Sequence, residues 1–481
     1  MTGGLRPARL FVGASATGPG PAPVPEPAPV PEPAGGPGPA PGPEPAPAPE
    51  PPRARHAARR SAAPRPPKSL VADGRRYDVV RAWPRGRNHA LLELTSGGAT
   101  VAGQWFADGD ALAEAARGAP APASVVGDVL LQPAGADARL RALPGVLAEA
   151  GALLVAHRPG RRAVVALPGP GAAPRAFAKV VRPSRSHDLA GRGRLVAELI
   201  DGVTVPRLLE GSDLEAGVLL WSVVPGRTLH DLGADGDWTP SRAHHAWRAA
   251  GAAVTRLHDA PQDRVAARHG AEDELSAIAH WLDPAVAHGL LDPELVARAG
   301  DRVTAALLAD RGGDDLGVLH RDLHDKQLLL ADPVEAGDAG AGEGADDGAG
   351  EGADGGVVGA DADGDAGGGG VGAYAVDGAA IAGAGPVGMI DVDTLAVGER
   401  ALDIANAVVH LELRQAQGLL RPDLAHAARA GLLAGAAPTD TERVADYADA
   451  TRLRLAGVYA YRPRWRAVAT DLLRRVAQPT P

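Results

Sequence analysis

The chain has 481 residues, a formal net charge of −10 and no cysteine. Its length allows two or three domains, and the missing cysteines exclude disulfide frameworks and thiol catalysis and give no argument for export. No apolar run approaches the length of a signal peptide or a membrane span, so we expect a cytoplasmic protein without a membrane partner.

Two segments have compositions that cannot form a core. Residues 1–67 contain 21 of the 44 prolines, mostly at alternate positions, which predicts a disordered, extended tail. The segment 335–387 is rich in Gly, Ala and Asp and has no Lys or Arg, which predicts a disordered acidic insertion. This insertion carries 11 acidic residues, so the rest of the chain is about neutral and its charge favours no nucleic-acid partner.

The segment 68–150 begins as a β-meander. Short apolar runs separated by Pro, Gly and Asn predict strands, and alanine-rich runs predict helices. The predicted strands are 76–83, 89–95, 99–106 and 124–132, and the predicted helices are 110–118 and 136–151, the second interrupted by Pro144. We find no chemical motif here and predict a small N-terminal cap module.

The remaining chain places strands first and helices second. Residues 151–226 predict a β-rich lobe with a hairpin at 152–167, a small-residue loop at 168–174 and strands at 175–183 and 217–224. Residues 227–481 predict a helical lobe. Its first helix, 239–260, has Thr239 or Ser241 as N-cap and an apolar face formed by Trp247, Ala250, Gly251, Val254 and Leu257. This order indicates an α+β protein with two lobes.

Lysine is rare in this chain. Only Lys68, Lys179 and Lys326 are lysines among 49 basic residues. Arg is a planar fork whereas Lys is a compact point charge, so each remaining lysine invites a specific reason. Lys68 ends the Pro-rich tail, but Lys179 lies in a predicted strand and Lys326 in a charged loop.

That loop carries the strongest signal. The sequence "GVLHRDLHDKQLLL", Gly317–Leu330, runs from one apolar strand through polar residues to another, where a structural turn would favour Gly, Asn or Pro. "HRDLHDKQ" matches the kinase catalytic-loop pattern H-R-D-x-x-x-x-N, with Gln327 supplying the amide at its last position. The pattern favours Asp322 as a catalytic residue.

Two further segments offer parts of a phosphoryl-transfer site. Asp391 ends the strand in "MIDVD", and Lys179 follows a loop that contains Gly169 and Gly171. Each alone has a simpler explanation, namely a helix cap, a surface lysine or a common turn. Their order together with the loop favours a site.

These residues resemble the aminoglycoside phosphotransferase and choline kinase-like superfamily of small-molecule kinases. The likeness rests on "LHRDLHDKQLLL" and "GMIDVDTLAVGERALDIANAVVHLELR" and extends over residues 152–475 without the insertion. It implies a protein-kinase-like bilobal fold with a small β-rich N-lobe and a larger helical C-lobe. Gln327 and the extra N-terminal segment are similar to maltokinase-type members.

The resemblance also implies roles for single residues. Asp322 would orient or deprotonate the substrate hydroxyl, and Lys326 would neutralise the transferred phosphoryl group. Gln327 and Asp391 would hold Mg²⁺ against ATP, assisted by Asp393.

It further implies how the nucleotide is held. Lys179 would contact the α- and β-phosphates and pair with a helix carboxylate, for which Glu198 is the best candidate. Gly169 and Gly171 would form the glycine loop of the cofactor site, and Asp403 would fix the loop backbone.

The sequence therefore predicts an ATP- and Mg²⁺-dependent kinase that phosphorylates a hydroxyl of a sugar, aminoglycoside or amino alcohol. The alternatives are a protein kinase, although no A-P-E segment follows Asp391, and a nucleotide-binding pseudokinase. Docking of the Pro-rich tail on SH3-like partners is weaker, because its repeats lack a basic anchor. The motifs are specific to the superfamily and not to a substrate, and they leave the oligomeric state open.

Overall fold

The computed structural model describes residues 64–171, 173–309, 315–331 and 386–478. The predicted disordered tail, apart from residues 64–67, and the acidic insertion, apart from residues 386–387, lie outside them. No helix of the described residues is both long and apolar enough to cross a membrane.

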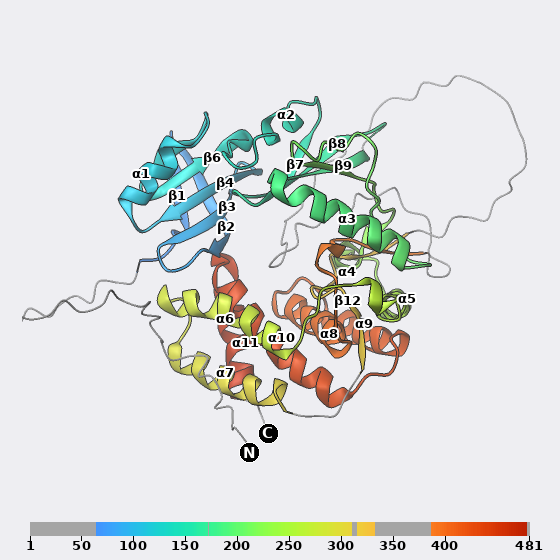
Figure 1. Cartoon of the computed structure of the whole chain (residues 1–481). Coiled ribbons are helices and arrows are strands. Elements are labelled where there is room, and N and C mark those ends of the chain that lie inside the picture. The colour runs from blue at the N-terminus through green and yellow to red at the C-terminus, as the bar shows by residue number, and fades with distance from the viewer. Residues whose placement is uncertain (1–63, 172, 310–314, 332–385, 479–481) are drawn as a thin grey trace, which may run out of the picture. The chain divides into compact units, whose positions relative to one another are not determined.

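The first sheet is antiparallel and has six strands in the order β1-β2-β3-β4-β6-β5 (blue in Figure 1). The predicted three-stranded meander is present as β2, β3 and β4. The elements are β1 (Ser69–Ala72), β2 (Arg75–Pro84), β3 (His89–Ser96), β4 (Ala99–Phe106), α1 (Gly109–Arg117), β5 (Ser124–Val126) and β6 (Val129–Gln132). Leu112 of α1 packs on Phe106 and Leu130, so the helix covers part of one sheet face.

Two elements of this region differ from the prediction. Residues 124–132 form the hairpin β5–β6 and not one strand, because Gly127 takes a φ of 61° that permits a tight turn. The helix predicted at 136–151 is reduced to α2 (Leu143–Leu147). Pro144 lies in its first turn, where a missing N–H is tolerated, and therefore begins this helix instead of interrupting it.

The second sheet carries Lys179. Its order is β10-β9-β8-β7, all antiparallel, with β7 (Leu153–Arg158), β8 (Arg162–Pro168), β9 (Pro174–Val181) and β10 (Val218–Trp221). Lys179 lies opposite Val164 and Leu219. Side chains alternate along a strand, so Lys179 shares a face with Phe177, while the other face packs against Leu140 and Leu143.

Two small sheets hold the predicted catalytic segments. One has the order β11-β13-β14, with β11 (Arg227–Thr228), β13 (Leu328–Leu330) and β14 (Val387–Met389), and the other pairs β12 (Leu316–Leu319) with β15 (Ala396–Glu399). The loop with Asp322 therefore connects β12 to β13. Asp391 follows β14, whose pairing with β13 brings it to that loop.

The rest of the described chain is helical, which confirms the α+β class with strands first and helices second. The helices are α3 (Pro183–Leu199), α4 (Leu229–Ala234), α5 (Pro240–His258), α6 (Ala271–Ala287), α7 (Pro293–Leu307), α8 (Ala401–Ala416), α9 (Pro422–Gly435), α10 (Thr441–Ala460) and α11 (Arg466–Ala477). Thr239 caps α5 by accepting a hydrogen bond from the N–H of Arg242, and the predicted apolar face of α5 is buried. Leu257 of that face is 0% exposed, and burying such a side chain contributes roughly 1.5–3 kcal/mol.

The helices pack around the two segments that the sequence predicts to be catalytic. Helix α5 lies against α9, and α10 lies against α6, α8 and α11. One core cluster joins residues of α5, α8 and α9 to the strands β12, β13 and β14. The loop with Asp322 is therefore built on a packed helical base.

Candidate active site

Asp403, at the start of α8, fixes the backbone of the loop between β12 and β13. The N–H groups of His320 and Arg321 each donate a 2.8 Å hydrogen bond to its carboxylate, and His258 contacts it at 3.1 Å. Burial alone would raise the pKa of Asp403, but these hydrogen bonds and nearby imidazoles lower it. Asp403 thus stays ionised and holds Arg321 at a φ of 74°, as the sequence predicted for its role.

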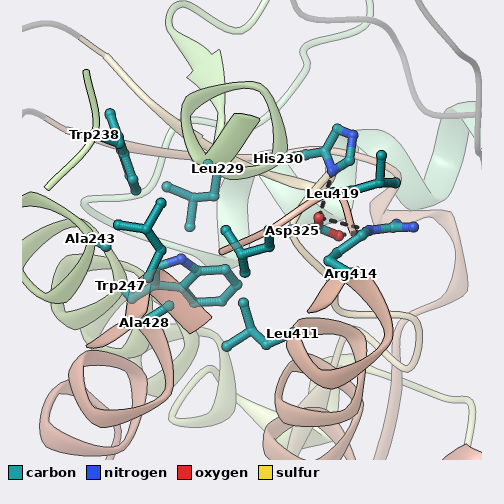
Figure 2. Close-up of a pocket in the computed structure, with 13 residues that line it drawn as sticks. Leu229, His230, Trp238, Ala243, Trp247, Asp325, Leu411, Arg414, Leu419 and Ala428 are labelled. Atoms are coloured by element: carbon teal, nitrogen blue, oxygen red, sulfur yellow. Dashed lines mark hydrogen bonds and ion pairs between the residues drawn. The ribbon is translucent and has the colours of Figure 1, made fainter. Parts of the chain in front are cut away.

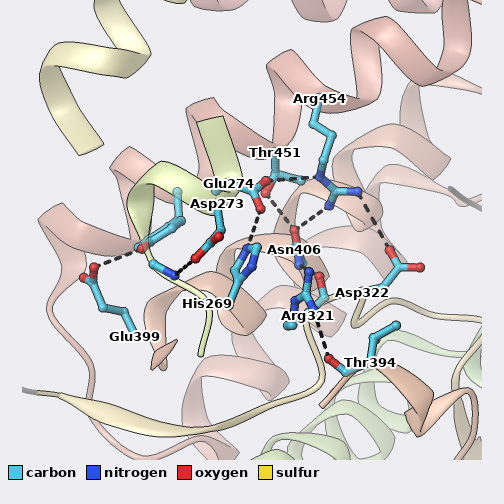
Figure 3. A network of polar contacts seen from close by, with 12 residues as sticks. His269, Asp273, Glu274, Arg321, Asp322, Thr394, Glu399, Asn406, Thr451 and Arg454 are labelled. Atoms are coloured by element: carbon cyan, nitrogen blue, oxygen red, sulfur yellow. Dashed lines mark hydrogen bonds and ion pairs between the residues drawn. The ribbon is translucent and has the colours of Figure 1, made fainter. Parts of the chain in front are cut away.

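Asp322 extends from this loop toward α10. Its carboxylate lies 3.9 Å from a guanidinium nitrogen of Arg454, and its side chain is 14% exposed (Figure 3). The same guanidinium contacts Glu274 at 3.2 Å and Asn406 at 3.0 Å. Asp322 is therefore beside a positive charge that is anchored in the helical base.

Sequence reasoning missed this support. Glu274 also contacts His269, and Asn406 donates to the carbonyl of Arg321 and accepts from Thr451 (Figure 3). Asn406 could have been found, since it lies three residues after Asp403 and therefore on the same helix face. Arg454 and Glu274 lie on helices with many other charged residues, and no local pattern singles them out.

Gln327 is placed as a ligand residue would be. It is 1% exposed, and its side-chain oxygen has no hydrogen-bond partner among the residues that the structure describes. The N–H of Ile390 donates a 3.0 Å hydrogen bond to the carbonyl of Gln327, which ties the loop to the strand end before Asp391. A buried amide oxygen without a donor is costly unless something else contacts it.

Asp391 follows β14 in a left-handed backbone conformation, with φ 57° and ψ 40°. Non-glycine residues rarely adopt this region, although Asp tolerates it better than most, and such strain concentrates at functional sites. Its side chain is 5% exposed. A carboxylate and the amide oxygen of Gln327 therefore belong to adjoining segments.

Lys179 contacts this carboxylate from the second sheet. Its ammonium nitrogen is 3.6 Å from Asp391 and in direct contact with Asp393. Burial alone would raise the pKa of Asp393, but the charges of Lys179, Arg162 and Arg192 lower it. The structure thus brings Lys179, Asp391 and Asp393 together as the sequence suggested.

The predicted pairing of Lys179 with Glu198 is wrong. Glu198 is 61% exposed and pairs at 2.9 Å with Arg264, because Val196 and Leu199 of α3 face the core and turn Glu198 outward. Helix α3 contributes Arg192 instead, whose guanidinium donates a 3.0 Å hydrogen bond to the carbonyl of Asp393.

The predicted glycine loop lies too far from Lys179 to share a nucleotide site with it. Gly169 and Gly171 form the β8–β9 turn, next to the paired Pro168 and Pro174. Lys179 lies five residues after Pro174, which is roughly 17 Å along a strand. The turn at the other end of β8, residues 159–161, is nearer to Lys179. Gly169 and Gly171 therefore belong to the β8–β9 turn, and their predicted place in the cofactor site is wrong.

The second half of the loop is anchored through Asp325. Its carboxylate accepts hydrogen bonds of 2.9 and 3.2 Å from Arg414 and contacts His230 at 2.7 Å (Figure 2). Burial alone would raise the pKa of Asp325, but the charge of Arg414 and these hydrogen bonds hold it well below its usual range. Lys326, the next residue, is half-buried, and its N–H donates to His324.

The pocket beside Asp325 is too small for a substrate. Trp238, Trp247 and Leu411 line it together with His230 and Arg414, and its cavity volume is about 10 Å³, which holds one water at most (Figure 2). His324, Asp325 and His410 lie close enough to share an ion, yet Arg414 already neutralises Asp325. We assign this cluster to support of the loop.

Comparisons with solved structures give distant likenesses. An aminoglycoside phosphotransferase from Streptomyces rimosus is 19% identical, with coverage of 66% of this chain and 96% of that chain and a TM-score of 0.40. A choline/ethanolamine kinase family protein from Mesorhizobium loti is 16% identical, with coverage of 72% and 94% and a TM-score of 0.39. A macrolide 2'-phosphotransferase from Brachybacterium faecium is 16% identical, with coverage of 66% and 89% and a TM-score of 0.34.

The sequence comparisons are more specific. No curated protein has significant similarity to the chain. Residues 130–337, however, match the phosphotransferase enzyme family, and this segment contains Lys179, Asp322 and Gln327. The match agrees with the resemblance drawn from the motifs: residues 130–337 of this chain are similar to the phosphotransferase enzyme family.

Proposed function

We propose that this protein transfers the γ-phosphoryl group of ATP, with Mg²⁺, to a hydroxyl of a small molecule. One observation carries the proposal. The loop with Asp322 and Gln327 is bonded to the segment of Asp391 through Ile390, and Lys179 contacts Asp391 from another sheet. Residues from three separate parts of the chain thus meet around one position.

The donor atoms fit a magnesium ion. Mg²⁺ prefers oxygen ligands, and Gln327 and Asp391 offer an amide oxygen and a carboxylate on adjoining segments. Within the described part of the chain nothing donates a hydrogen bond to the Gln327 oxygen, which supports a role as a metal ligand. When bound, Mg²⁺ would neutralise charge on the β- and γ-phosphates.

Two apolar clusters near this position would suit the adenine ring of ATP. Val164, Ala166 and Phe177 form a buried cluster on the face of Lys179, with Val223 packed against it. A second cluster joins Val224, Leu329 and Ile390. The clusters meet at consecutive residues of the segment after β10, where an adenine could lie between them.

The transfer step follows from the placement of Asp322. Its carboxylate accepts the proton of the substrate hydroxyl while the new oxygen–phosphorus bond forms and the bond between the γ-phosphorus and the β-phosphate oxygen breaks. Lys179 holds the nucleotide phosphates and ADP leaves. Arg454, whose guanidinium nitrogen is 3.9 Å away, would orient the Asp322 carboxylate through its positive charge. Positioning and charge supply most of the rate.

The experiment is a screen for ADP release. Purified protein is incubated with ATP and Mg²⁺ and a panel of sugars, aminoglycosides and amino alcohols. We expect one class to raise ADP release well above the rate without acceptor, and Asp322→Asn to abolish that increase. ADP release that no acceptor changes, in protein that binds ATP, would contradict transfer to these classes.

A second candidate, nucleotide binding without transfer, is favoured by the pairing of Lys179. The lysine contacts both Asp391 and Asp393, whereas Glu198 of α3 is paired elsewhere. Under this alternative the protein would bind ATP tightly and release no ADP with any acceptor. The same screen, with nucleotide binding measured in parallel, separates the two.

A further inference from the structure

A cavity away from the proposed catalytic residues lies where the first sheet meets the β7–β8 turn. Its walls come from β3, β4, β6 and α1 on one side and from residues 137–139 and 159–161 on the other. Its volume is about 270 Å³, just below the range of roughly 300–1,000 Å³ typical of small-molecule sites. A small metabolite fits such a space.

Three arginines from separate elements line this cavity. Arg85 follows β2, Arg139 precedes α2, and Arg161 lies in the β7–β8 turn. Within the described ranges, no ion pair includes any of the three. Burial, Arg182 and Arg185 all lower the pKa of Arg161, as expected where positive charge is not neutralised.

The acidic residues of the cavity do not neutralise these three arginines. Asp137 accepts hydrogen bonds from His157 and from the N–H groups of Gly160 and Arg139. Glu114 is paired with Arg117 on the surface of α1. Both carboxylates are thus already used, and the net charge that faces the cavity is positive.

Neutral polar groups form one wall in a fixed orientation. Gln132 donates to the carbonyl of Ala136 and accepts from Gln104, whose own oxygen contacts His89 at 3.1 Å. His89 is stacked on Phe106 with ring centroids 4.5 Å apart. A chain of amides ordered in this way, beside an apolar floor of Leu91 and Leu130, is typical of a ligand pocket.

We propose that this cavity binds a small organic anion that carries a phosphate or carboxylate group. Arg85, Arg139 and Arg161 would hold the anionic group, because a guanidinium fork matches both groups with paired hydrogen bonds. Gln104 and His89 would contact the polar remainder of the ligand. The site is separate from that of the proposed reaction and does not depend on it.

The test is isothermal titration calorimetry of the full chain with inorganic phosphate, glucose 6-phosphate and citrate, and with trimethyl phosphate as the uncharged control. We expect at least one anion to bind and trimethyl phosphate not to bind, with an affinity of the anion that falls as salt rises. Tighter binding of glucose 6-phosphate than of citrate would identify a phosphate ligand, and the reverse a carboxylate ligand.

Variants locate the site. Arg85→Gln with Arg139→Gln should weaken binding at least about tenfold, the effect of 1.4 kcal/mol. Arg141→Gln, in the same loop but outside the cavity, should not. Asp391→Ala, which disables the proposed nucleotide site, should bind the anion like the wild type. Binding by no anion, equal loss in the Arg141 variant, or loss in the Asp391 variant would each overturn the proposal.

Discussion

The ammonium nitrogen of Lys179 lies 3.6 Å from a carboxylate oxygen of Asp391, and both side chains are 5% exposed. This contact joins the second sheet to the segment that follows β14. Lys179 also contacts Asp393 of the same segment. The contact with Asp391 places the charge of a proposed nucleotide-binding residue beside a proposed metal ligand. The first prediction concerns this lysine.

Lys179→Arg should be nearly as damaging as Lys179→Met, with kcat/KM for ATP reduced about 100-fold in both. Lys179 is packed between Val164 and Leu219 of neighbouring strands, and a planar fork does not fit where a compact ammonium does. Lys68→Arg, at an exposed position, is the matched control and should have no effect. Steady-state kinetics at varied ATP checks this, and a fully active Lys179→Arg enzyme would show that the lysine is incidental.

Gln327→Leu should raise the Mg²⁺ concentration for half-maximal activity at least about tenfold, since it removes one of two proposed ligands. It should not lower the melting temperature of the metal-free protein, because the replaced oxygen accepts no hydrogen bond from the described residues. Gln415→Leu, on the exposed side of α8, controls for the substitution itself. A lower melting temperature with an unchanged Mg²⁺ requirement would indicate a structural residue.

Arg414→Met should destabilise the protein by about 3–5 kcal/mol, because it leaves the buried carboxylate of Asp325 without its main partner. Urea unfolding at pH 7 measures this effect. Arg421→Met, which removes an exposed arginine paired with Asp423, should leave the midpoint unchanged. Equal effects of the two substitutions would contradict the role given to Arg414.

Asp325 also predicts a pH dependence. Its pKa is lower in the folded protein than in the unfolded chain, so its stabilisation is fully present above the unfolded value of about 4. It is lost as pH falls below that value and through the folded pKa. Asp325→Asn should therefore reduce stability at pH 7 and flatten the fall in stability between about pH 5 and pH 2. An unchanged slope would show that Asp325 does not titrate in this window.

The loop and the strand ends could be predicted because their signals are local. "HRDLHDKQ" and "MIDVD" each combine an apolar strand with polar residues at a fixed spacing, and the structure places both as expected. The apolar face of α5 was equally readable from its 3.6-residue period. Lys179 was found through composition, since lysine is rare in this chain.

The partners of these residues could not be predicted, because they depend on packing between distant elements. Glu198 was the plausible carboxylate of α3, but the buried face of that helix turns it outward to Arg264. The Gly169–Gly171 loop shortly precedes Lys179 in sequence, but the extended strand β9 between them holds the loop far from Lys179. Arg454 reaches Asp322 from α10, and no spacing in the sequence relates the two.

The most direct test of the account is the turnover of Asp322→Asn. With the acceptor identified by ADP release, this variant should bind ATP and Mg²⁺ like the wild type and lose at least about 100-fold in kcat, the usual scale for removing a general base. Its fold should be intact, since Asp403 and not Asp322 holds the loop backbone. Unchanged kcat in Asp322→Asn would contradict the assignment of this loop as the catalytic centre.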